Sequence, residues 1–408
     1  MSNEWTTIVG FAGIICAMFV VYGGYILWNK KRSRQRLLWK IREDWGAWPT
    51  REYDYYDWEA IEGYYANKEC DTFQIDDITW EDLDLSRVFM LINHNASFMG
   101  EGYLYYLLRT PSFDEEELQE RERLITYFQE HSEQREQLQV FFHQMGKAGR
   151  SSIFDAVYNL AQVQPVSNLH HYLMIGLFVA SILSLFVAPK PGILILIGVM
   201  YFTMQDYYKQ KRPIEKYIVS CRYLLRTLDA AREMTKIEIP EIKEYQDRIR
   251  SAAQSFGRLK RNTFFLMNGA RTDGDLLVGV VMYFNACFHI DLIQFATVVT
   301  EMKKHIPEFE ILVENMGKIE TAISIGSFRE CMKEYCIPEL EQEDVSAHNI
   351  KTANDECVAI NKDKNQKVYL EAENLYHPLI REPVKNNIQT EKNVLLTGSN
   401  ASGKSTFL

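Results

Sequence analysis

The chain lacks the cysteine patterns of a secreted or zinc-binding protein. Its seven cysteines are scattered over 408 residues, no two form a C-x-x-C pair, and Cys331 and Cys336 have no histidine nearby at zinc spacing. Reduced cysteines facing the cytosol are therefore expected. No Ser/His/Asp or Cys/His set with interpretable spacing is present, so no nucleophilic site is predicted. The pair His170-His171 is expected to lie at a membrane boundary rather than to bind a metal.

An excess of positive charge is also missing. The formal net charge is -10, which argues against a chain-wide nucleic-acid surface, so any DNA contact has to come from a local basic patch. The densest patch in the soluble part is Arg258, Lys260, Arg261 and Arg271, where a solvated helix end and a phosphate contact both stay open. Residues 40–80 combine many Trp and Tyr side chains with acidic ones, which favours a small core or a docking strip over a base-stacking surface.

Charge is absent from the stretch near the N-terminus, which predicts a membrane anchor. Residues 8–28 are almost continuously apolar, and about 20 such residues suffice to cross the hydrocarbon core of a bilayer. A basic run over residues 30–36 follows at once. Because a cleaved signal peptide carries its positive charge before the apolar run, an uncleaved anchor with its N-terminus outside is expected.

A second apolar block, residues 172–207, is interrupted by a turn signal at Ala188–Gly192. It predicts a transmembrane hairpin, with a buried pair of core helices as the alternative. Basic residues follow the block at 209–212, whereas only Lys190 lies at its tip, so the tip is expected outside. Three crossings in total predict an integral membrane protein whose N-terminus is outside and whose bulk is cytoplasmic.

Most of the remaining chain has apolar residues at helical spacing. One helix is expected to be capped by Ser97, to carry Glu101 in its first turn and to end at Pro111. A long amphipathic helix should follow from Ser112 to about His143. Further helices are expected over residues 214–236, 240–256, 275–304 and 310–334.

The last stretch carries the strongest functional signal. Residues 393–397 indicate a buried strand, and the glycine-rich loop that follows fits G-x-x-x-x-G-K-[ST]. In such a loop backbone N–H groups cradle phosphates, Lys404 reaches the β/γ-phosphates, and the Ser405 hydroxyl ligates Mg²⁺. ATP and Mg²⁺ are the predicted cofactors. The predicted binding residues are Gly398, Ser399, Asn400, Ala401, Ser402, Gly403, Lys404, Ser405 and Thr406.

Two features upstream suggest how an ATPase domain begins. Residues 367–373 indicate a lead-in strand, and residues 385–390 a polar stretch before the buried strand. The loop, together with His377-Pro378-Leu379, resembles the start of the ATPase domain of the MutS family of DNA mismatch repair proteins. Ser399 and Ser402 stand where that family usually has Pro and Gly. Residues 100–111 and 316–324 resemble, more weakly, the start of the family's core domain and its core helix just before the ATPase.

The resemblance implies a fold and a division of the chain. The expected fold class is mainly α: three transmembrane helices, a cytosolic helical MutS-like core, and the first strands and P-loop of an α/β ABC-type ATPase head. The expected segments are an anchor with a basic flank (1–36), an aromatic and acidic segment (37–77), two parts of the helical core (78–169 and 211–338) separated by the hairpin (170–210), and the start of the ATPase domain (339–408).

The resemblance also implies how the protein works. Family members pair their ATPase heads, so a homodimer is expected once a head is complete. The domain that reads mismatches, with its Phe-x-Glu wedge, has no counterpart here, which argues against mismatch reading. The Walker B, signature and switch regions would lie beyond Leu408, so ATP hydrolysis by this chain alone is not expected and its status as an enzyme stays open.

Two functions from different classes fit these features. The first is a membrane-anchored MutS-like protein in which ATP binding drives head dimerisation, with double-stranded DNA or a protein as partner. The alternative is a non-enzymatic membrane scaffold, or a truncated product with an incomplete ATPase site.

Overall fold

The structure is a computed structural model of the 408-residue chain. It describes residues 24, 28–29, 31–70, 72–147, 153–159, 168–260, 266–267, 276–339, 370–380, 382–390, 394–395 and 397. The chain divides into two compact units, Met1–Cys331 and Met332–Leu408. The described part is mainly helical, as predicted, and contains two strands, both in the second unit.

The first unit begins with a series of helices, several of which start at a side-chain cap. Residues 28–29 and 31–44 are helical. Ser97 caps the helix that starts at Phe98, where its Oγ accepts a hydrogen bond from the N–H of Gly100, so the predicted cap is confirmed. The helices that follow residue 44 are α2 (Tyr55–Asn67), α3 (Asp77–Asp82), α4 (Leu85–Ile92), α5 (Phe98–Arg109), α6 (Glu115–Glu130), α7 (Ser132–Met145) and α8 (Ile153–Tyr158).

The single long helix predicted from Ser112 to about His143 is wrong, because α6 and α7 are separate. The backbone of His131 leaves the helical region, with φ -109° and ψ 73°. Its ring stacks on Tyr127 with centroids 4.3 Å apart, and its Nδ1 lies 3.0 Å from the Tyr127 carbonyl oxygen. The cap of α6 is Asp114 rather than Ser112.

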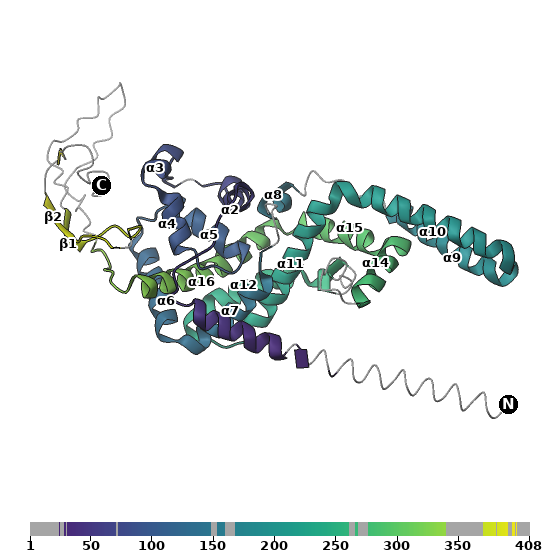
Figure 1. Cartoon of the computed structure of the whole chain (residues 1–408), viewed down its shortest axis with the longest axis horizontal. Helices are drawn as coiled ribbons and strands as arrows, with labels where there is room; N and C mark the ends of the chain where they lie inside the picture. Colours follow the sequence, from purple (N-terminus) through teal and green to yellow (C-terminus); the bar gives the residue numbers. More distant parts are fainter. Residues whose placement is uncertain are drawn as a thin grey trace, which may run out of the picture. The chain divides into compact units, whose positions relative to one another are not determined.

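Two long helices, α9 (Asn168–Val187) and α10 (Pro189–Lys211), lie side by side and are joined at Ala188 (Figure 1). Helix α9 is long and apolar enough to cross a membrane, and only 17% of its apolar window is buried. That exposure argues against the alternative of a buried pair of core helices. Helix α10 does not meet the same criterion of length and hydropathy, because Lys190 and the polar residues after Phe202 shorten its apolar part.

The prediction of three transmembrane helices is therefore not supported. The described residues contain one helix that passes the length and composition test, or up to two if the bent pair Val281–Phe288 and Ile290–Met302 counts as one span. Most of the predicted first span, residues 8–28, lies outside the described residues.

The rest of the first unit is a second set of helices. They are α11 (Glu215–Met234), α12 (Lys243–Ser255), α14 (Leu276–Phe288), α15 (Ile290–Met302) and α16 (Ile306–Met332), with short 3-10 turns η2 (Arg212–Ile214), η3 (Pro240–Ile242) and η4 (Gly257–Lys260). The helix predicted over residues 214–236 is confirmed as α11. The stretch predicted over residues 275–304 is broken at His289, whose φ of 52° is left-handed, and α14 and α15 meet there at 77°.

Two hydrophobic cores hold the first unit together. The larger one includes Leu312, Met316 and Ile319 of α16, packed with residues of α5 and α11. The smaller one contains Trp80 and Tyr105, whose ring centroids are 4.8 Å apart. Other members of the smaller core are Tyr53, Ile61, Trp58, Tyr65, Phe89 and Leu104. Part of the aromatic segment around residues 40–80 therefore builds a core, which is one of the two alternatives predicted for it.

The second unit contains an antiparallel pair of strands, β1 (Leu370–Leu375) and β2 (Asn386–Thr390). The lead-in strand is thus present, whereas the stretch predicted to be merely polar forms β2. The buried strand predicted over residues 393–397 is wrong for the residues described there. Val394 and Leu395 have no regular structure and are 62% and 88% exposed, because no described strand or helix of this unit covers them.

Candidate functional site

The predicted nucleotide-binding loop lies outside the described residues. This applies to all of Gly398–Thr406, including Lys404 and Ser405. Of the predicted basic patch, Arg258 and Lys260 belong to η4, and the other two members, Arg261 and Arg271, fall outside the described ranges.

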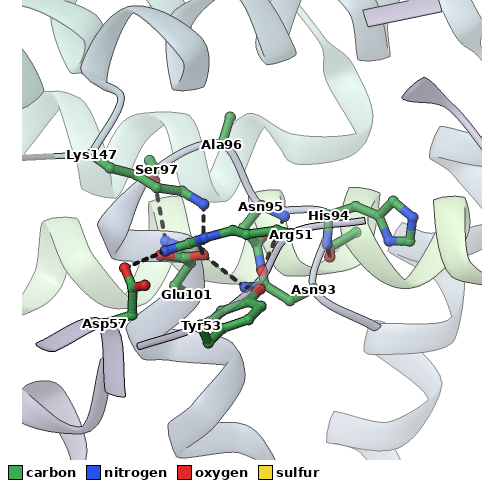
Figure 2. A network of polar contacts seen from close by, with 12 residues as sticks. Arg51, Tyr53, Asp57, Asn93, His94, Asn95, Ala96, Ser97, Glu101 and Lys147 are labelled. Carbon is green, nitrogen blue, oxygen red and sulfur yellow. Dashed lines mark hydrogen bonds and ion pairs between the residues drawn. The ribbon is translucent and has the colours of Figure 1, made fainter. Parts of the chain in front are cut away.

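A buried polar network occupies the start of α5 (Figure 2). Two carboxylates stand at its centre: Glu101 of α5 is 0% exposed and Glu320 of α16 is 3% exposed. Carboxylates are almost never fully buried unless they are paired or hydrogen-bonded. The partners of these two groups therefore define what the network does.

Glu320 of α16 holds the two residues that precede the first residue of α5. Its Oε1 accepts hydrogen bonds from the backbone N–H groups of Ala96 at 2.8 Å and Ser97 at 2.9 Å. The Ser97 hydroxyl donates to Oε2 of the same carboxylate. The pKa of Glu320 is raised to about 7, mainly by burial and to a smaller extent by the nearby Glu101, while these hydrogen bonds lower it.

Gly100 lets the two helices approach closely at this point. A Cβ at Gly100 would overlap the Glu320 carboxylate and the side-chain oxygen of Asn95. Glycine is therefore needed here because a larger residue has no space. Its backbone conformation does not require glycine, since its φ is not in the left-handed region. Gly317 has a similar role one turn away on α16, where a Cβ would meet the Tyr103 side chain.

Glu101 collects cationic and amide donors from three other segments. Lys147, which follows α7, donates from Nζ at 2.7 Å, and Asn93, in the loop before α5, donates from Nδ2 at 2.7 Å. Arg51, before α2, forms an ion pair with the same Oε1. Figure 2 shows the three side chains converging on this carboxylate. The Oε2 atom of Glu101 is buried and receives no hydrogen bond from a described residue.

Arg51 is itself held in place by its neighbours. Its guanidinium pairs with Asp57 at 2.7 Å and lies over the Tyr53 ring, 4.4 Å from the centroid. Burial, which is the largest cause, raises the pKa of Tyr53 to about 12. The Tyr53 hydroxyl accepts a hydrogen bond from Asn93 at 2.9 Å. The segment before α2 is therefore joined to the start of α5.

A second contact of α16 secures the same loop. The Ser324 hydroxyl donates to the Ile92 carbonyl oxygen at 2.8 Å and accepts from the His94 N–H at 2.8 Å. Ser324 is four residues after Glu320, so both side chains lie on one face of α16. Two successive turns of α16 are therefore hydrogen-bonded to the α4–α5 loop.

Another polar cluster lies where α9 and α10 meet α15. His170 pairs with Asp206 at 2.9 Å, and His171 Nδ1 lies 3.2 Å from His289 Nδ1. Asp291, fully buried, accepts from the Tyr207 hydroxyl at 2.7 Å. Lys211 Nζ lies 3.3 Å from the same carboxylate oxygen. No group of three or more His, Cys, Asp or Glu side chains among the described residues is arranged to hold a metal ion.

The sequence contained only part of the signal for these clusters. Ser97 and Glu101 were predicted at the start of α5. Glu320 was missed as a partner, although an acid between Ile319 and Ala322 on an apolar helical face was a usable sign. Arg51 was missed because it lies 50 residues from Glu101, and no local pattern connects them.

Comparison of the chain with protein-family models, with curated proteins and with solved structures finds no match. The resemblance to the MutS family therefore rests on the motif residues quoted from the sequence.

Proposed function

We propose that this protein is a membrane-attached, MutS-like protein that binds ATP and Mg²⁺ at Gly398–Thr406. The observation that carries the proposal is the spacing of Gly398, Gly403, Lys404 and Ser405, because a phosphate cradle needs a flexible loop, a cation and a hydroxyl in this order. Lys404 contacts the β/γ-phosphates and Ser405 ligates Mg²⁺.

The family part of the proposal involves two helices of the core. The two upstream segments that resemble the family's core, residues 100–111 and 316–324, cover most of α5 with the turn after it and part of α16. These helices meet through Gly100 and Glu320. Helix α16 ends at Met332, where the second unit begins along the chain. In the proposed mechanism, ATP binding pairs two heads as a homodimer, and α16 passes the change to the core.

The proposed membrane attachment uses the α9–α10 pair. The 20 residues of α9 span roughly 30 Å at 1.5 Å per residue, which matches the hydrocarbon core of a bilayer. Large apolar side chains are uncovered at its far end, where Phe186 is 83% and Val187 is 87% exposed. Uncovered apolar surface of this extent is typical of contact with lipid or another apolar partner.

The polarity of the pair gives its direction. The charged and histidine side chains gather at one end, where His170 of α9 pairs with Asp206 of α10. At the opposite end Lys190 is the charged residue. The polar end is therefore proposed to face the cytosol together with the bulk of the chain, and the apolar end to enter the bilayer.

Double-stranded DNA is proposed as a partner only through the family resemblance, and hydrolysis of ATP is not part of the proposal. A non-enzymatic membrane scaffold is the second candidate. The exposed apolar surface of α9 favours it, because attachment to a membrane through this surface does not require a bound nucleotide.

The deciding experiment is Mg²⁺-dependent binding of a fluorescent ATP analogue to the full chain in nanodiscs. Lys404→Ala removes a charge-assisted contact and should lower affinity roughly 10- to 100-fold. Lys385→Ala is the matched control, because Lys385 is also in the second unit but forms an ion pair with Glu334. Binding that is absent, or equally strong in Lys404→Ala, would overturn the ATP-binding proposal and leave the scaffold as the better account.

A further inference from the structure

The helix over residues 31–44 carries a concentrated, exposed positive charge. Its basic side chains are exposed, and acidic residues appear only at its end, at Glu43 and Asp44. The whole chain has a net charge of -10, so this helix is an exception within an acidic protein. The exposed basic residues are Lys31, Arg32, Arg34, Arg36, Lys40 and Arg42.

Most of this charge has no partner within the described residues. Arg42 pairs with Glu136 at 2.8 Å. No described carboxylate forms an ion pair with Lys31, Arg34, Arg36 or Lys40. A run of unneutralised cations on one helix attracts an anionic surface, because each added charge strengthens the local field.

Two tryptophans lie on the same face as part of this charge. Trp28 is 57% exposed and Trp39 is 65% exposed. The Arg32 guanidinium lies 5.2 Å from the Trp28 ring centroid. Because Trp28, Arg32 and Trp39 are separated by four and seven positions, they share one face of the helix. Ile41, on the opposite side, is buried to 1% exposure.

The C-terminal end of this helix is fixed to the core, which holds the face in a set orientation. The Gly46 N–H donates to the Ser327 hydroxyl at 3.0 Å. The Arg135 guanidinium carbon lies 3.5 Å from the centroid of the Trp45 ring. The basic face is therefore presented by a helix anchored on α7 and α16.

We infer that this face docks on an anionic phospholipid surface, with its Lys and Arg side chains on lipid phosphates and Trp28 and Trp39 in the interfacial layer. Exposed Trp next to Lys and Arg is typical of helices that lie at a membrane interface. Nucleic-acid phosphate would satisfy the charge. However, the sequence predicts that the apolar residues 8–28 before this helix are a membrane anchor, which favours a bilayer surface over nucleic acid. The inference rests on the proposed membrane attachment and adds the lipid class to it.

The test uses the full chain with vesicles of phosphatidylcholine alone or with added phosphatidylglycerol. Flotation reports attachment, and quenching by brominated lipid, taken as the difference between wild type and Trp39→Phe, reports the position of Trp39. Brominated phosphatidylglycerol should quench Trp39 more than brominated phosphatidylcholine. The triple variant Lys31→Gln, Arg32→Gln, Arg36→Gln should abolish that excess, because each cation near an anionic surface contributes roughly fivefold in affinity.

A matched variant, Lys243→Gln, Arg248→Gln, Arg250→Gln, removes three exposed charges from α12 and should keep the excess quenching. Equal quenching by both lipids with flotation intact would overturn the inference but leave the attachment standing. No flotation with either vesicle would instead overturn the attachment. Binding of a double-stranded DNA oligonucleotide that the helix variant loses, with lipid quenching unchanged, would assign the face to nucleic acid and overturn the inference.

Discussion

The Oε1 atom of Glu320 accepts a hydrogen bond from the backbone N–H of Ser97 at 2.9 Å, although the two residues are 223 positions apart. Ser97 caps α5 locally, and a side chain of α16 in turn binds the backbone N–H of this cap residue. The start of α5 is therefore bonded to α16, and a displacement of either helix should displace the other.

The Glu320 carboxyl should make stability depend on pH. Its pKa is raised from 4.5 to about 7 in the folded protein. Between these values the folded state holds a proton that the unfolded chain releases, so the free energy of unfolding falls as pH rises from about 4.5 to 7. The change attributable to this group is roughly 3 kcal/mol at most. Glu320→Gln, which has no proton to lose, should flatten the dependence in thermal melts across this pH range.

The matched control is Glu133→Gln on the exposed first turn of α7. It removes one carboxylate from the same unit without touching the network, so it should retain the wild-type slope. A Glu320→Gln protein that still loses stability between pH 5 and pH 7 as wild type does would show that another group is responsible.

Gly100→Ala should destabilise the protein. The new Cβ would overlap the Glu320 carboxylate, and overpacking of this kind costs about 1–3 kcal/mol, which exceeds the helix-propensity gain of roughly 1 kcal/mol. Gly279→Ala on α14 is the control, because a Cβ there meets nothing within 4 Å. Chemical denaturation should show a lower midpoint for the first variant only; equal midpoints would mean that α5 and α16 are not in close contact.

Arg51→Ala should cost about 2 kcal/mol, because it removes a charged hydrogen bond to the buried Glu101 while Lys147 still compensates part of the charge. The exposed pair Arg248–Glu244, with side chains 55% and 76% exposed, offers a comparison in which Arg248→Ala should cost at most about 0.5 kcal/mol. A double-mutant cycle of Arg51→Ala with Glu101→Gln measures the coupling directly. Coupling indistinguishable from zero would contradict the ion pair.

Leu177→Arg in the middle of α9 should weaken membrane insertion, since an arginine at the centre of a bilayer costs about 2.5–3.5 kcal/mol on insertion scales. Leu177 is 42% exposed, and Ile78, which is 72% exposed on α3, provides the control Ile78→Arg. Carbonate extraction of membranes should release more of the Leu177→Arg protein. Identical retention of both variants would argue that α9 does not enter the bilayer.

The sequence by itself determined the features that depend on neighbouring residues. The cap at Ser97, the helix over residues 214–236 and the apolar character of α9 follow from spacing, capping chemistry and hydropathy within a few turns. The nucleotide-binding motif at Gly398–Thr406 is likewise a local pattern, and it stays a prediction.

Only the tertiary structure decided which distant groups meet. It joined Glu320 to Ser97, brought Arg51 and Lys147 to Glu101, and placed His171 beside His289. It also split the predicted long helix at His131 and left a single helix, α9, or up to two spans, as membrane candidates among the described residues. The physical reason is that a buried charge is stable only when it has partners nearby in the folded protein. Those partners come from segments far apart in the sequence, so no local sequence pattern identifies them.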